Sequence, residues 1–111
     1  MCVRGVAALD RWLAAHRDVA GFVVWEPVLA GDEAPPAAGR RAAHARNYWD
    51  GSRVVSAAMM RSGADAKCLA QGDADEAVVW DAVFDYAPGA TTPAACGRTI
   101  LRALPLLAER R

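Results

Sequence analysis

The sequence has almost no lysine, no net charge and no long apolar run. Lys67 is its only lysine, although lysine and arginine together number 13 and are balanced by 13 acidic residues. A neutral chain has no broad positive field to attract nucleic acid or an anionic membrane surface, so we predict neither partner. No apolar run reaches the roughly 18 residues of a membrane span. Asp10 and Arg11 interrupt the apolar pattern near the N-terminus, which argues against a secretion signal.

Cysteine is scarce, and the spacing of the cysteines argues against both a disulfide framework and a metal site. Cys2, Cys68 and Cys96 are odd in number and far apart, which is not a disulfide framework and fits a reducing cytoplasm. A metal site would need a closely spaced ligand pair such as Cys-x-x-Cys, and the sequence has none. We therefore predict a cytoplasmic protein without metal or cofactor, in which Cys96 is a buried small hydrophobic residue. Frequent arginine and alanine indicate a GC-rich bacterial genome.

The length of 111 residues favours a single domain, residues 1–111. Apolar residues recur every three to four positions from Val3 to Arg17, which predicts an amphipathic helix. Val19 to Trp25 is an apolar and β-branched run that ends before Pro27, as is typical of a buried parallel strand. Trp25 is accordingly expected in the core.

Two further helices are predicted in the middle of the chain, at Ala38 to Tyr48 and at Arg53 to Arg61. The turn Asp50-Gly51-Ser52 provides a cap for the second of them. That helix should direct a set of apolar side chains inward, namely Val54, Val55, Ala58 and Met59.

The C-terminal third begins with a second strand, from Ala77 to Tyr86, in which large apolar residues alternate with others. A final helix is predicted to be capped by Thr92, with Pro93 in its first turn. Pro105 should kink or break that helix between Leu101 and Leu104. Helices that alternate with strands indicate an α/β protein.

Three segments carry a recognisable pattern: Phe22 to Leu29 (FVVWEPVL), Asn47 to Val55 (NYWDGSRVV) and Val79 to Tyr86 (VWDAVFDY). In this order they resemble a group of small bacterial thioredoxin-like proteins, over roughly Cys2 to Pro88. The resemblance implies a thioredoxin-like α/β fold with helices packed on a small mixed sheet. It also places Cys2 where such a protein has the second cysteine of a Cys-x-x-Cys pair.

The sequence departs from that pattern at three places. It has neither the first strand nor the first cysteine of the pair, so we expect it to be N-terminally incomplete, with a natural start upstream of Met1. Glu76, just before the second strand, stands where catalytic thioredoxins have a cis-proline. If the chain does begin at Met1, the strand from Val19 to Trp25 exposes an unpaired edge through which a homodimer could form.

Cys2 is the candidate reactive residue. Unpaired backbone N–H groups and the dipole of the helix that follows would stabilise its thiolate, and Arg4 would add to the effect. We therefore predict a thiol-redox or thiol-binding protein that acts through Cys2 on a protein or small-thiol partner. The alternative is a non-catalytic thioredoxin-fold interaction module, which the missing cysteine pair and the missing proline favour.

Other polar residues have two interpretations each. Glu26, at the end of a strand, and Asp81 could accept a proton from a nearby thiol, or they could face solvent or cap backbone groups. One basic cluster lies on the predicted middle helix, where it could dock an anion or form a solvated surface; its members are Arg40, Arg41, His44 and Arg46.

Overall fold

The computed structural model describes residues 3–27, 35–62, 79 and 81–110. These residues form an α/β structure with helices α1, α2 and α4, a short 3-10 helix η1 and two two-stranded sheets. The chain divides into two compact units, Met1–Val55 and Ser56–Arg111, which are described separately. The predicted α/β class is confirmed at this level.

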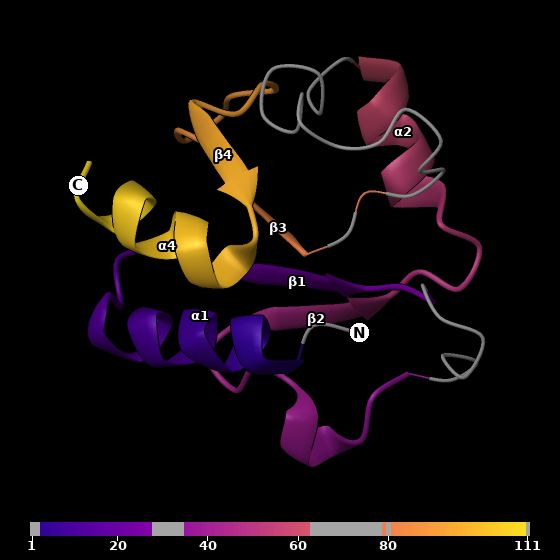
Figure 1. Ribbon diagram of the computed structural model, residues 1–111, viewed down its shortest axis with the longest axis horizontal. Helices are drawn as coiled ribbons and strands as arrows, with labels where there is room; N and C mark the ends of the chain where they lie inside the picture. The colour runs from indigo at the N-terminus through magenta and orange to yellow at the C-terminus, as the bar shows by residue number, and fades with distance from the viewer. Residues whose placement is uncertain (1–2, 28–34, 63–78, 80, 111) are drawn as a thin grey trace. The chain divides into compact units, whose positions relative to one another are not determined.

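Helix α1, Val3–Ala15, confirms the first predicted helix (Figure 1). It buries Gly5, Val6 and Leu13 on one side, as the spacing of apolar residues predicts. His16 follows the C-terminal end of the helix, and its Nδ1 lies at hydrogen-bond distance, 2.7 Å, from the carbonyl oxygen of Trp12. The rings of these two residues stack with their centroids 4.0 Å apart.

Strand β1, Phe22–Trp25, pairs in parallel with β2, Arg46–Trp49. The predicted helix from residue 38 to 48 is therefore wrong, because only η1, Ala38–Arg40, is helical there. The side chain of Asn47 explains the difference. Its Nδ2 donates to the carbonyl oxygens of Ala42 and Ala45, and its Oδ1 accepts from the Ala42 amide, so the backbone folds into a turn instead of a helix.

The parallel pair has one inner and one outer face. Val23 and Trp25 are buried, whereas Phe22, Val24 and Tyr48 are exposed, so β1 is buried on one face only and not on both as predicted. The inner face packs with Val6 of α1 and with Ala42 into the core of the first unit. Three partly buried apolar residues complete that core: Leu9, Ala45 and Trp49. Trp25 is only 4% exposed, which confirms its predicted core position.

Helix α2, Val54–Ser62, begins within one residue of its predicted start. Asp50 caps it as expected: its two carboxylate oxygens accept from the amides of Val54 and Val55 at 2.9 and 2.8 Å. The predicted inward face is wrong, however. Val54 and Val55 are exposed, and Ser56 is the buried residue of this helix, with its hydroxyl donating to the carbonyl oxygen of Val79.

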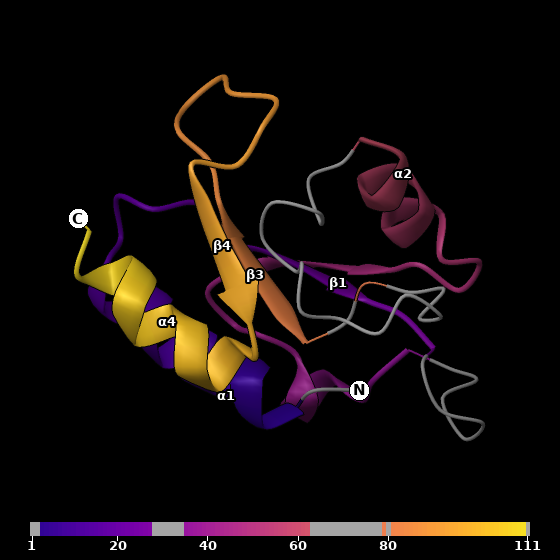
Figure 2. The same ribbon diagram turned by 45° about the horizontal axis from the view of Figure 1, so that its top comes forward.

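Strands β3, Ala82–Asp85, and β4, Ala95–Arg98, form an antiparallel hairpin (Figure 2). Helix α4, Ile100–Ala108, packs against both strands and buries Ile100, Leu104 and Leu107. The predicted helix start at Thr92 is wrong, because the amide of Ala94 donates to the carbonyl oxygen of Asp85 and leads the chain into β4. Of the two predicted effects of Pro105, a kink or a break, the break is wrong, since α4 continues through this residue to Ala108.

Candidate functional site

An open cleft of about 460 Å³ lies in the first unit, where β1 and β2 begin and α1 ends. Its lining combines apolar and basic side chains. The apolar ones are Leu13, Val19 and Phe22, and the basic ones are Arg17, His44 and Arg46.

Local folding explains why these residues meet. The amide of Arg46 donates to the carbonyl oxygen of Gly21 at 2.9 Å, which starts the parallel pairing and aligns Arg46 with Phe22. Paired residues of neighbouring strands direct their side chains to the same face, and both of these are exposed. Gly21 lies so close to α1 that a Cβ atom there would overlap the end of the Leu13 side chain, so a larger residue would require Leu13 to move.

His44 is held at the rim of the cleft by Asp10 of α1. Oδ1 of Asp10 accepts from the His44 amide at 2.7 Å and lies 3.1 Å from His44 Nδ1. Burial by itself would raise the pKa of Asp10, but the backbone amides of His44 and Ala43, together with the His44 ring, bring that pKa below its ordinary value. The lowered pKa keeps Asp10 ionised at neutral pH, so this pair places one acid and one imidazole beside the two arginines.

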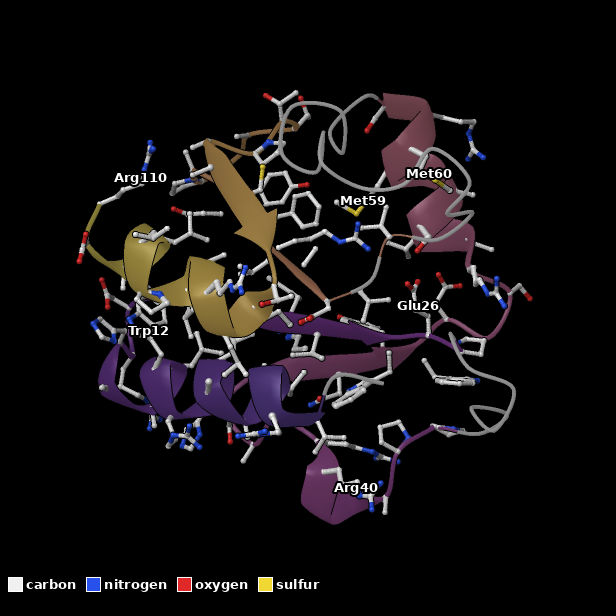
Figure 3. All side chains as sticks on the ribbon, in the orientation of Figure 1. Trp12, Glu26, Arg40, Met59, Met60 and Arg110 are labelled. Atoms are coloured by element: carbon white, nitrogen blue, oxygen red, sulfur yellow. The ribbon has the colours of Figure 1, made fainter. Side chains whose placement is uncertain are left out.

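The predicted basic cluster is only partly correct. His44 and Arg46 line the cleft, but Arg41 turns away and donates through Nε to the carbonyl oxygen of Pro36 at 3.1 Å. Arg40 stands on η1 and does not line the cleft either (Figure 3). Arg17 comes to the cleft from the turn that follows α1, and no sequence signal pointed to it because it lies far from Arg46 along the chain.

Cys96 corrects another prediction. It lies in β4 instead of a helix, it is partly buried, and it is disulfide-bonded, so it is not the free hydrophobic cysteine that the spacing suggested. Cys2 and Cys68 lie outside the described residues. Helix α1 does begin at Val3, directly after Cys2 in the sequence, and its first turn contains no acidic residue.

The two carboxylates that the sequence singled out have different surroundings. Oδ1 of Asp81 accepts from the amide of Ile100 at 3.2 Å, so Asp81 caps the start of α4, one of its two predicted roles. Its backbone has a φ of 49°, a left-handed conformation that aspartate tolerates better than most residues. Glu26 follows β1 directly and is buried, which rules out the solvent-facing interpretation for this residue (Figure 3).

Comparisons of the chain with family models, with curated proteins and with solved structures gave no match. Within the described parts of the chain, no helix is long and apolar enough to cross a membrane. The same residues contain no group of three or more histidine, cysteine, aspartate or glutamate side chains suited to hold a metal ion.

Proposed function

We propose that the protein is a thioredoxin-like thiol–disulfide exchange protein that acts through Cys2. The observation that carries this proposal is that α1 begins at Val3, directly after Cys2 in the sequence, with no acidic residue in its first turn. Cys96 is disulfide-bonded, so the folded chain already contains disulfide chemistry. A disulfide and a thiol are the two reactants of exchange.

The position of Cys2 supports its role as the attacking thiol. It immediately precedes α1, whose first turn contains Arg4 and no acidic residue. The unpaired N–H groups and the positive end of the helix dipole favour a thiolate over a thiol at such a position. The reactive form of Cys2 would therefore be populated at neutral pH.

The exchange step balances without any further reagent. The Cys2 thiolate attacks one sulfur of a disulfide, either in a partner protein or in the oxidised, disulfide form of a small thiol. A bond forms between Cys2 and that sulfur while the partner's own S–S bond breaks, and the displaced sulfur leaves as a thiolate that takes up a proton. The reverse reaction with a free thiol restores Cys2.

Replacing the cysteines singly tests this proposal. The rate at which the reduced chain reacts with glutathione disulfide should fall at least about tenfold in Cys2→Ser, because an alcohol cannot replace the thiolate. Cys68→Ser and Cys96→Ser are the matched controls and should retain most of the rate. An unchanged rate in Cys2→Ser would overturn the assignment.

The helix effect can be tested apart from the cysteine itself. Arg4→Glu places a negative charge in the first turn of α1, which should raise the pKa of Cys2 and slow exchange at pH 7 by roughly two- to fivefold. Arg11→Glu makes the same charge change later in α1, where the residue is exposed, and should have little effect. Equal slowing in both variants would argue against the helix effect.

A second candidate function is a non-catalytic binding module of thioredoxin-like type. The cleft lined by Arg17 and Arg46 favours it, because a cleft of about 460 Å³ falls in the range of small-molecule sites. A chain whose Cys2 reacts no faster than free cysteine, while the cleft binds a ligand, would have this function.

A further inference from the structure

We infer that the cleft between the end of α1 and the start of β1 and β2 binds a small organic oxyanion with a short apolar tail. The anionic head would contact Arg17 and Arg46, and the tail would lie against Phe22. This inference is independent of the thiol chemistry proposed above.

The charges of the cleft favour an anion. Arg17 and Arg46 are both exposed, and neither forms an ion pair with any residue that the structure describes. His44 is engaged by Asp10, and both carboxylate oxygens of Asp50 accept from backbone amides of α2. Asp18, next to Arg17 in the sequence, is exposed. Two guanidinium groups that have no ion-pair partner among the described residues can each donate paired hydrogen bonds to a carboxylate or a phosphate.

The apolar residues that line the cleft favour a ligand that carries an apolar tail as well as an anionic head. Phe22 is 58% exposed although it is a large aromatic residue in a strand. Val19, which is partly buried, lines the same cleft, whereas Leu13 in that lining is buried and leaves Phe22 as the main exposed apolar residue. Covering this surface with methylene groups would be favourable, and an inorganic ion would leave it exposed to water.

The cleft is also separate from the proposed thiol site. It lies at the C-terminal end of α1, whereas Cys2 precedes the N-terminal end, and the 13 residues of the helix span about 20 Å. A small ligand in the cleft would therefore not reach the N-terminal turn of α1 at Val3. Binding and thiol exchange can therefore be measured independently.

The test measures binding of four probes to the full chain by calorimetry: hexanoate, hexyl phosphate, acetate and hexan-1-ol. Hexanoate or hexyl phosphate should bind at least about tenfold more tightly than both hexan-1-ol, which lacks the charge, and acetate, which lacks the tail. The tighter of the two anions identifies the head group as carboxylate or phosphate. Binding of hexan-1-ol as tightly as hexanoate and hexyl phosphate would overturn the role of the arginines. Binding of acetate as tightly as hexanoate would overturn the role of the tail.

Variants locate the site. Arg17→Gln and Arg46→Gln should each weaken binding of the tighter anion about tenfold, and the double variant should abolish it. Arg40→Gln is the matched control, because Arg40 is exposed but does not line the cleft. Phe22→Ser should weaken hexanoate much more than acetate. Equal weakening in Arg40→Gln, or unchanged binding in the double variant, would overturn the site, and Cys2→Ser should bind normally even if it fails in exchange.

Discussion

The indole Nε1 of Trp25 donates a hydrogen bond to Oδ1 of Asn47 at 3.1 Å, linking β1 to β2 through side chains. The same amide group of Asn47 also binds the backbone of Ala42 and Ala45. One side chain thereby satisfies a buried indole and shapes the turn that leads into β2. The parallel pair depends on it, because the segment before β2 would otherwise be free to continue as a helix.

We predict that Asn47→Ala destabilises the protein by about 2–4 kcal/mol. The substitution removes four hydrogen bonds and leaves the indole N–H of Trp25, a residue only 4% exposed, without this acceptor. Urea unfolding monitored by tryptophan fluorescence measures the change. Tyr48→Ala, at the next position on the exposed outer face, is the control and should cost about 1 kcal/mol or less. Similar losses for both variants would contradict the role given to Asn47.

The Asp10–His44 pair predicts a pH-dependent contribution to stability. The pKa of Asp10 is lowered from its ordinary value of 3.8, so its ionised form contributes stability above about pH 3.8 that is lost as the pH falls through the folded pKa. Asp10→Asn should therefore lower stability by about 0.5–1 kcal/mol at pH 6, less than a buried pair because both side chains are partly exposed. The difference from the wild type should shrink below pH 3.8. A difference that persists or grows in acid would show the opposite sign and contradict the assignment.

Gly97 of β4 is predicted to tolerate a side chain poorly. A Cβ atom there would lie 2.8 Å from the Cβ of Ala103, so the hairpin packs on α4 at this point without room for a methyl group. Gly97→Ala should destabilise the protein by about 1–3 kcal/mol through overpacking. Gly39→Ala, where nothing lies within 4 Å of the added atom, is the control and should be close to neutral in thermal unfolding. A stable Gly97→Ala variant would mean that β4 and α4 separate easily.

The homodimer expected from the sequence stays a prediction. Among the described residues β1 pairs with β2 alone, and a strand with one unpaired edge can pair with a strand of a second chain. We expect size-exclusion chromatography to show a dimer whose population rises with protein concentration. Val24→Lys should reduce it, because a charge on an exposed strand opposes edge pairing, whereas Leu106→Lys on α4 should not. A monomer at all concentrations would contradict the prediction.

The sequence predicts those elements whose stability is local. Helix α1 follows from the spacing of its apolar residues, and α2 follows from Asp50, which caps it across four positions. Strand β2 could not be predicted, because Arg46–Trp49 shows no apolar alternation and its pairing depends on Asn47 meeting Trp25, a residue 22 positions away. Strand β4 was equally hard to predict from the sequence, because contacts with β3 and α4 stabilise it and its own four residues show no strand pattern.

The candidate site was predictable to a smaller extent. The sequence identified His44 and Arg46 as part of a basic cluster but placed them on a helix with Arg40. Only the parallel pairing of β1 with β2 brings Arg46 beside Phe22, and only the end of α1 adds Arg17. A cleft made by three separate segments has no signature along the chain.

The most direct test of the proposed thiol function is the intact mass of the folded chain after alkylation, with and without prior reduction. We predict one alkyl group without reduction, located on Cys2 by peptide mapping, and alkylation of all three cysteines after reduction. Alkylation of three cysteines without reduction, or of Cys68 in place of Cys2, would contradict the proposal. The first outcome would mean that the chain has no disulfide, and the second that Cys2 is not its free thiol.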